Sequence, residues 1–354
     1  MTEGLGSTCI AGKRRSEGRM EYGEVVVTVL CVCYNHARSL RRALESLVSQ
    51  KTDFAYELLV HDDASTDGSQ DIIREFQRRY PQIVRPMLEE ENQYGQGRNF
   101  LGKMLAEARG SYIAYCETDD FWSDSLKLQL QVDALRTHPE CSFCVHNTQG
   151  VNIRGDRLPQ HFPPIRVDAG AITPEEYLHH ELFEDKWMFQ LSSFMSRRET
   201  MVEYEEISAS EFPSKYYQVG DQPLFLFCLT KGSAWYIDRD MSCYTVDSGG
   251  FMTSLGKGGS FCERVQLGYI QGLEAFDAYS HGRFATAIQR AVLRRQFLYD
   301  LATHNYRAIS NGKYKDLNSE LGSLRRLRYR FLGRLRHGRL QDHSAEEPPH
   351  EIVR

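Results

Sequence analysis

The chain has 354 residues, 41% of them apolar, and 43 Lys and Arg against 48 Asp and Glu give a formal net charge of −5. This apolar content is enough for a hydrophobic core, so a disordered chain is excluded. A negative net charge argues against a basic nucleic-acid-binding protein, and we expect no nucleic-acid partner. The longest apolar run, residues 25–33, is far shorter than the roughly 20 residues that span a bilayer.

The N-terminal segment and the cysteines indicate a cytoplasmic protein. Basic residues such as Lys13 and Arg14 have no apolar segment beside them, so we expect no secretory signal peptide. Nine scattered cysteines, an odd number, are typical of a reducing compartment. Residues 1–22 are predicted to be a flexible tail, and residues 341–354 a polar tail.

Strand-like and helix-like segments alternate from residue 24 to residue 145. The segment 24–33 is β-branched and apolar on both faces, which predicts a strand that is buried on both sides. Further strands are predicted at 56–61, 83–88, 111–116 and 141–145, and helices at 38–50, near 72–80, at 100–108 with Gly110 as its end, and from a cap at Ser123. This order predicts an α/β fold with a doubly wound, mostly parallel sheet.

The second half of the chain is less regular. Residues 150–185 are rich in Pro and His, apolar segments return at 186–247, and residues 248–260 contain several Gly and small polar residues, which predicts a mobile loop. Helical spacing of apolar residues resumes from 263 to about 336.

Polar residues follow the first two predicted strands, where ligands bind in sheets of this kind. The segment Tyr34-Asn35-His36 lacks the Gly residues of a dinucleotide fingerprint, which argues against a nicotinamide-dependent dehydrogenase. After the second strand, Asp62 and Asp63 are candidates to accept hydrogen bonds from a base or a ribose. The alternative is a turn and helix cap, which is the interpretation that we favour for residues 65–67.

Three carboxylates, Glu117, Asp119 and Asp120, follow the predicted strand 111–116. Carboxylates packed so closely repel one another, and a divalent cation such as Mg²⁺ or Mn²⁺ would hold them ionised. The alternative is a solvated acidic turn at the start of the next helix.

These motifs, in this order, resemble those of the inverting glycosyltransferase family 2. They are Tyr34-Asn35, the run 59–68 around Asp62 and Asp63, Gly97-Arg98-Asn99, the run from Gly110 to Ile113, and the run from Glu117 to Trp122. The similarity covers residues 24–147 and continues more loosely through Gly220-Asp221 and residues 244–250. It implies a GT-A fold over residues 23–260, with a nucleotide-sugar half at 23–147 and an acceptor half at 148–260, followed by a helical extension at 261–340.

The resemblance also implies roles for the residues of the first half. The positions that hold the nucleotide and phosphates are Tyr34, Asn35, Asp62, Asp63 and Arg98. Asp120 corresponds to the direct metal ligand, and Asp119 to a contact with the sugar or ribose that also belongs to the metal site. Thr118 stands where members of the family often carry Gly.

By the same resemblance, Asp221 is the general base that accepts the proton of the acceptor hydroxyl. The alternative is that Asp221 caps the helix that carries residues 224–229, and one residue can do both. Asp247 stands where relatives often have His, and it is a candidate metal ligand, although its charge would lie near the diphosphate. The Gly-rich stretch after it is expected to close over the donor.

The predicted function is the metal-assisted, inverting transfer of a sugar from a UDP- or dTDP-sugar to a hydroxyl of a glycan or lipid-linked glycan, in cell-surface polysaccharide or lipopolysaccharide synthesis. The enzymatic alternative is a sugar-1-phosphate nucleotidylyltransferase, although the Gly-rich loop of that class is missing after the first strand. The non-enzymatic alternative is a sugar-nucleotide-binding protein that has lost its chemistry.

Three other features invite a functional interpretation. The Arg-rich segment 325–339 predicts peripheral contact with an anionic membrane at its inner face, or alternatively the charged outer face of a terminal helix. Cys141, Cys144 and His146 resemble half of a zinc site, but a buried strand is the favoured interpretation. His179 and His180 are predicted to be solvated surface residues.

Overall fold

The computed structural model describes residues 24–317, apart from positions 99, 185, 209–211, 217–219, 247–258, 311 and 316. The predicted tails at 1–22 and 341–354, Asp247 and the Arg-rich segment 325–339 therefore lie outside the described residues. The strands are β1 Val25–Cys33, β2 Ala55–Asp62, β3 Val84–Leu88, β4 Tyr112–Tyr115, β5 Phe121–Trp122, β6 Cys141–Val151, β7 Arg157–Phe162, β8 Gly170–Ile172, β9 Met195–Arg197 and β10 Ser233–Thr245.

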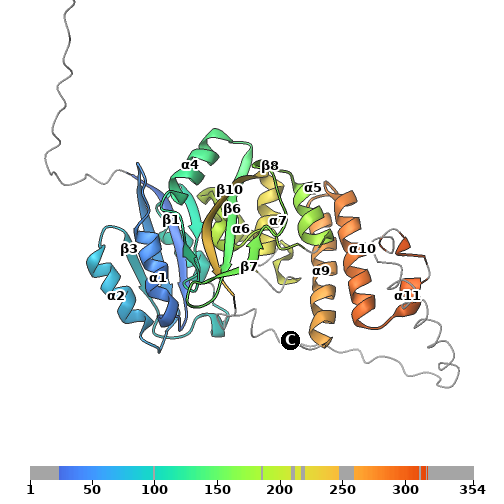
Figure 1. Cartoon of the computed structure of the whole chain (residues 1–354), viewed down its shortest axis with the longest axis horizontal. Coiled ribbons are helices and arrows are strands. Elements are labelled where there is room, and N and C mark those ends of the chain that lie inside the picture. The colour runs from blue at the N-terminus through green and yellow to red at the C-terminus, as the bar shows by residue number, and fades with distance from the viewer. Residues whose placement is uncertain are drawn as a thin grey trace, which may run out of the picture.

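Helices connect these strands and continue beyond the last of them (Figure 1). They are α1 Ala37–Val48, α2 Ser69–Arg79, α3 Phe100–Glu107, α4 Lys127–Thr137, α5 Pro174–Tyr177, α6 Arg198–Ser208, α7 Asp221–Lys231, α9 Gly259–Tyr279, α10 Ala285–Ala302 and α11 Tyr306–Ser310. Shorter turns are η1 Tyr94–Gln96, η3 Leu191–Ser193, η4 Pro213–Tyr216 and a π-helical turn, η2 Leu178–Phe183.

The strands form a mixed sheet in the order β3-β2-β1-β4-β9-β6-β10-β5, with β7 added beside β6 and β8 beside β10. The strands from β3 to β4 run parallel, as their helical crossovers require, and β10 runs parallel to β6. The antiparallel pairs involve β5, β7, β8 and β9, which the sequence pattern does not predict. The predicted α/β fold is confirmed, with its parallel part concentrated in the first half of the chain.

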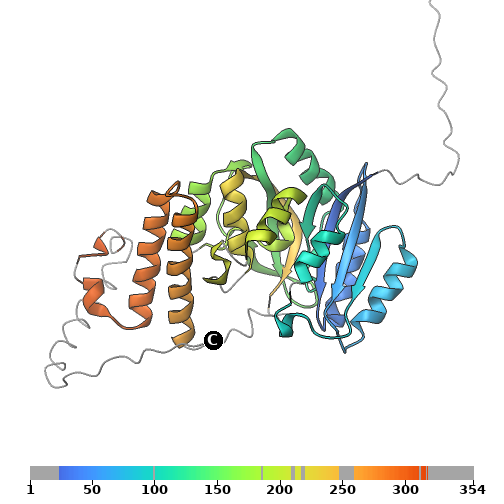
Figure 2. The same cartoon turned by 180° about the vertical axis from the view of Figure 1, so that it is seen from behind.

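Helices cover both faces of the sheet, which explains why β1 is apolar on both sides. One buried cluster joins the sheet to α1, α2 and α4, and a second joins it to α3, α6 and α7. The second cluster extends to α9 and α10, the C-terminal helices predicted from the spacing after residue 263. These two helices stand side by side at the end of the molecule away from β1–β3 (Figures 1 and 2).

Two local predictions are wrong. Gly110 does not end α3, which stops at Glu107; it packs so closely on β1 that a Cβ would lie 2.4 Å from the backbone nitrogen of Thr28. Ser123 does not cap α4, because that helix starts at Lys127 and the Ser123 hydroxyl bonds weakly to the carbonyl of Asp240.

Candidate active site

The carboxyl ends of β1, β2 and β4 meet at one edge of the sheet and bring the first predicted motifs together. The register pairs Cys33 with Asp62, so the turns that follow β1 and β2 are neighbours. The hydroxyl of Thr118 donates to the carbonyl of Val32 at 2.9 Å and also lies 2.8 Å from Nδ1 of His36. Thr118, which stands where members of the family often carry Gly, therefore bonds the acidic turn, residues 117–120, to the end of β1.

The turn after β1 is held in place by Asn35. This residue has a left-handed backbone with a φ of 57°, its amide donates to Oγ of Ser65 at 2.8 Å, and its side-chain oxygen accepts from the amide of Thr66 at 2.9 Å. These bonds fix the position of Tyr34, whose side chain is 50% exposed. Asn35 thus braces the turn, and Tyr34 is presented to solvent at the strand end.

Asp62 and Asp63 are both buried, but their carboxylates do different things. Both oxygens of Asp63 accept backbone hydrogen bonds, from Gln93 and Tyr94, and so hold the start of η1. In Asp62, Oδ1 accepts from Ser65 and Gln70, while Oδ2 is buried and has no hydrogen-bond partner among the described residues. An unpartnered buried oxygen is costly, which makes Asp62 Oδ2 the better acceptor for a ligand.

Arg98 lies beside this turn. Its guanidinium is 3.3 Å from Oε1 of Gln93 and 3.8 Å from Oε2 of Glu91, and its side chain is 55% exposed. It therefore provides a positive charge beside η1, the turn that Asp63 holds.

The acidic turn after β4 is joined to the end of β10. The amide of Thr245 donates to Oδ1 of Asp120 at 2.9 Å, and the hydroxyl of Thr245 donates to the carbonyl of Asp119 at 2.6 Å. Asp120 is buried, whereas the side chain of Asp119 is partly exposed. Asp120 is thus held inside the protein, and Asp119 faces the open edge.

Asp221, at the first residue of α7, joins these carboxylates from the other half of the chain. Desolvation and three neighbouring carboxylates raise the pKa of Glu117 above its usual range, although its side chain is exposed and solvent weakens both effects. Those neighbours are Asp119, Asp120 and Asp221. The pKa of Asp221 itself is raised to about 6, mainly by desolvation. The structure therefore brings together the predicted metal-binding and general-base residues.

The predicted capping role of Asp221 is not observed. Gly220 occupies the capping position of α7 and has no side chain to make a capping bond, and Asp221 lies one residue later, within the first turn. The next residue, Gln222, is buried and donates to Oε1 of Glu181 at 2.7 Å, while Oε2 of Glu181 accepts from the amide of Met188 at 2.6 Å. The start of α7 is thus fixed to η2 through a buried carboxylate.

Comparison with known proteins identifies the fold and the family. The model of the family described as glycosyl transferase family 2 matches residues 28–204. The chain belongs to this family. The crystal structure of residues 1–349 of S. aureus TarS in complex with UDP-GlcNAc has the same fold, with a TM-score of 0.52 at 17% identity over 78% of this chain and 79% of that one.

Two relatives show how far the sequence similarity of this family 2 member extends. The uncharacterized protein Rv1520 of Mycobacterium tuberculosis is 34% identical over 195 residues, 54% of this chain and 52% of that protein. The chain therefore spans about half the length of that relative. The dTDP-rhamnosyl transferase RfbG of Shigella flexneri is 26% identical over 210 residues, 58% of this chain and 67% of that protein.

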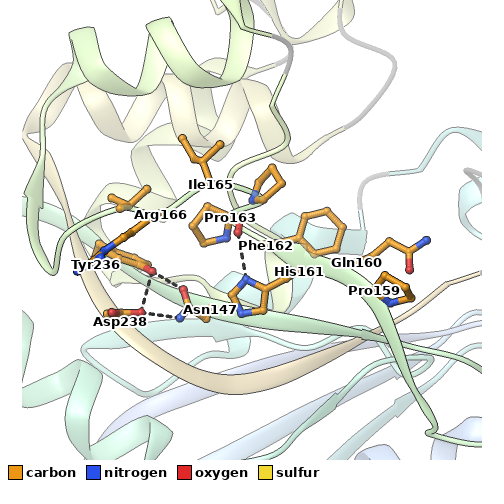
Figure 3. A pocket seen from close by; sticks show the side chains of 12 residues that line it. Asn147, Pro159, Gln160, His161, Phe162, Pro163, Ile165, Arg166, Tyr236 and Asp238 are labelled. Carbon is orange, nitrogen blue, oxygen red and sulfur yellow. Dashed lines mark hydrogen bonds between the residues drawn. The ribbon is translucent and has the colours of Figure 1, made fainter.

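A pocket of about 450 Å³ lies between β6, β10 and the segment that begins in β7 (Figure 3). Its polar floor is a network in which the hydroxyl of Tyr236 donates to Asn147 and lies near Asp238, and Asn147 donates to Asp238 at 2.9 Å. Its wall is the proline-rich segment 159–167. Phe162 of this wall packs edge-on against Tyr244. The pKa of the Tyr244 hydroxyl is raised by desolvation and by the charges of the acidic turn and of Asp221.

Sequence reasoning missed the residues that assemble this site across the fold. Thr245 lies inside a segment that we matched to the family, yet nothing in its type indicates a bond to Asp120. For Glu181 and Gln222 the sequence signal is weak, and it consists of Gln222 directly following Asp221, the candidate base. Trp122 belongs to the core: it is buried and its indole nitrogen donates to the carbonyl of Ser192 at 3.1 Å.

The zinc interpretation of Cys141, Cys144 and His146 finds no support in the described part of the chain. All three side chains are buried in β6, and His146 lies 2.8 Å from the carbonyl of Asn147. The seven cysteines among the described residues are buried and free. Among the described residues, no helix is both long enough and apolar enough to cross a membrane.

Proposed function

We propose that this protein transfers a sugar from a nucleotide-diphosphate donor to a hydroxyl of a glycan or lipid-linked glycan, in the synthesis of a cell-surface polysaccharide or lipopolysaccharide. The observation that carries the proposal is the meeting of Asp221 with Glu117, Asp119 and Asp120 at the edge of the sheet. A sugar transfer needs a base for the acceptor and charge compensation for the diphosphate. Asp221 suits the role of base, and a cation held by the other carboxylates would compensate the diphosphate charge. RfbG, whose name states a dTDP-rhamnosyl transfer, supports a dTDP-linked donor, and the complex of TarS with UDP-GlcNAc supports a UDP-linked one.

The nucleotide is proposed to bind at the ends of β1 and β2. Tyr34 is exposed there and suits stacking on a base, with Asn35 bracing it. The unpartnered Oδ2 of Asp62 suits a base NH or a ribose hydroxyl, with Asp63 fixing the facing turn. Arg98 would compensate part of the phosphate charge.

A divalent cation, Mn²⁺ or Mg²⁺, fits the donor set at the acidic turn. Desolvation and mutual repulsion raise the pKa values of Glu117 and Asp120, and hard divalent cations take carboxylate oxygens. Because one oxygen of Asp120 already accepts from Thr245, we propose the partly exposed Asp119 as the direct ligand and Asp120 as its support. This exchanges the roles that the resemblance implied. When bound, the cation would neutralise charge on the departing diphosphate.

The proposed reaction is a single displacement with inversion at the anomeric carbon. The acceptor oxygen forms a bond to that carbon as the bond to the diphosphate oxygen breaks, and Asp221 takes the hydroxyl proton. A pKa of about 6 leaves Asp221 ionised at neutral pH and still basic enough to share a proton. The pocket of Figure 3 is the proposed position of the acceptor glycan, since its polar floor and ring-bearing walls suit a saccharide.

The proposed location is the cytoplasm, with peripheral contact at the inner face of a membrane through residues 325–339. This contact would bring a lipid-linked acceptor to the pocket. Its support is the sequence of that segment alone.

The test is a binding and hydrolysis screen of UDP-, dTDP- and GDP-linked sugars by calorimetry, with Mn²⁺, with Mg²⁺ and with chelator. We expect one donor class to bind tightly only when metal is present, and we expect Asp119→Asn to abolish this metal-dependent binding. The matched control is Asp53→Asn, which removes an exposed carboxylate before β2. A folded protein that binds no donor under any condition contradicts the proposal.

A further inference from the structure

The turn η2 has a rare backbone geometry with a direct consequence for its side chains. It is a π-helical turn, in which the amide of Glu184 donates to the carbonyl of His179, five residues earlier, at 2.9 Å. In an α-helix, positions four apart share a face, and a π-helical turn brings positions five apart onto that face as well. Both His179 and His180 therefore reach the same carboxylate.

The three side chains converge on one point. Nδ1 of His180 lies 2.8 Å from Oε2 of Glu184, and Nε2 of His179 lies 3.6 Å from Oε1 of the same carboxylate. One ligand atom from each residue lies within 4.8 Å of the other two. Tetrahedral zinc places its ligand atoms about 3.4 Å apart, so small rotations of these partly exposed side chains would complete a site.

The two histidines were predicted to be solvated surface residues, and they are partly exposed: 38% of the His179 side chain and 30% of the His180 side chain are accessible. The ring of His179 stacks on Phe183, with centroids 5.3 Å apart, and this contact orients its nitrogen towards Glu184.

We propose that His179, His180 and Glu184 bind a transition-metal dication, with zinc the best fit. Two imidazole nitrogens and one carboxylate suit Zn²⁺, whereas Mn²⁺ and Mg²⁺ prefer oxygen ligands alone. Three protein ligands leave one position for water. This site is separate in residues and in ligand chemistry from the acidic turn after β4, and it does not depend on the proposed sugar transfer.

Metal at this site would hold η2 in its π-helical form. Glu181 lies within the same turn and accepts from Gln222, the residue next to Asp221. The site therefore braces the segment that fixes the start of α7. The expected consequence is a gain in thermal stability on zinc binding, since a ligand that binds only the folded state stabilises it.

The experiment measures Zn²⁺ binding to the full chain near pH 7.5, by competition with a chromophoric chelator, in wild type and in three conservative variants. His179→Phe keeps the ring that stacks on Phe183, while His180→Asn and Glu184→Gln keep polar groups of similar shape. The matched control is His281→Asn, which removes an exposed histidine at a left-handed position that Asn tolerates. Wild type and His281→Asn are expected to bind zinc equally.

Each of the three cluster variants is expected to weaken zinc binding by at least about tenfold, the loss seen even for outer-shell partners of metal ligands. Zinc is expected to raise the melting temperature of wild type and not of these variants. Should a variant fail to fold, the spectrum of Co²⁺-loaded wild type reports imidazole ligands directly. Equal zinc affinity in wild type and folded cluster variants, or no zinc binding by wild type, overturns the proposal.

Discussion

The amide of Thr245 donates a hydrogen bond to Oδ1 of Asp120 across 2.9 Å, and this bond joins the end of β10 to the acidic turn after β4. The hydroxyl of Thr245 adds a second bond, to the carbonyl of Asp119 at 2.6 Å. The two aspartates of the turn are thereby distinguished: one is an internal anchor, and the other has its side chain at the open edge of the sheet. The last described residues before the Gly-rich segment are fixed to the same turn.

The first prediction concerns this anchor. Asp120→Asn keeps an oxygen that accepts from Thr245, whereas Asp120→Ala leaves that buried amide without a partner. We expect the alanine variant to be less stable than the asparagine variant by about 1–3 kcal/mol. The measurement is urea unfolding of both proteins in chelator. The same pair of substitutions at Asp119 is expected to differ little, and a larger difference there would contradict the assignment.

The second prediction concerns the proposed base. Asp221→Asn removes the proton acceptor and keeps the size of the side chain, so we expect the transfer rate to fall by about 10² to 10⁴. Donor affinity and melting temperature should change little, because Gly220, and not Asp221, occupies the capping position of α7. Single-turnover transfer and donor calorimetry measure the two effects. Asp53→Asn is the control, and wild-type turnover by Asp221→Asn would remove this residue from the mechanism.

The third prediction is the pH dependence of the transfer. Desolvation raises the pKa of Asp221 from its usual value to about 6. The base works only when ionised, so kcat/KM should rise about tenfold per pH unit below pH 6 and become level above it. Steady-state rates at saturating metal, between about pH 5 and 8, report this limb. Its persistence in the residual activity of Asp221→Asn would assign it to a different group.

The fourth prediction concerns the acceptor. Tyr236→Phe removes the hydroxyl that bonds to Asn147 in the floor of the pocket, and Asp238→Asn removes its charge. If the acceptor glycan lies there, we expect a higher KM for the acceptor and an unchanged KM for the donor, because Tyr34 and Asp62 are untouched. Initial rates with each substrate varied in turn measure both constants. An increase confined to the donor KM would place the acceptor elsewhere.

The fifth prediction concerns Lys127, the buried first residue of α4. Its ammonium lies 4.0 Å from the centroid of Trp122 and donates to Oε1 of Gln131 at 2.6 Å. Burial lowers the pKa of Lys127 to about 7. Between about pH 7 and pH 10.4, the unfolded chain carries a proton that the folded protein does not, so the free energy of unfolding rises with pH through this window.

The measurement compares wild type with Lys127→Met, which keeps most of the apolar stem. From pH 7.5 to pH 9.5, we expect wild type to gain about 2 kcal/mol of unfolding free energy relative to the variant. Below pH 7 the difference should become constant, because both states of wild type then carry the proton. Parallel stability curves from pH 7 to pH 10 would show that Lys127 stays charged in the folded protein.

Local sequence patterns are enough to predict the alternation of strands and helices, the edge of the sheet where the candidate site lies, and the family. Each of these follows from local information: side-chain periodicity sets the element, and the carboxyl ends of parallel strands meet at one edge. Tyr34, Asp62 and Asp119 were found for this reason. The local errors, at Gly110 and Ser123, arose where a residue type common at helix ends is used in a tertiary contact instead.

Tertiary contacts determine which of two adjacent aspartates has its carboxylate bonded within the protein. They also determine how Asp221 approaches the acidic turn. Asp62 and Asp63 read alike in sequence, but their partners come from different turns. The convergence of His179, His180 and Glu184 depends on a π-helical turn that no local pattern of residues specifies. These distinctions rest on hydrogen bonds between segments far apart in the chain, which form only when the sheet and its helices have packed.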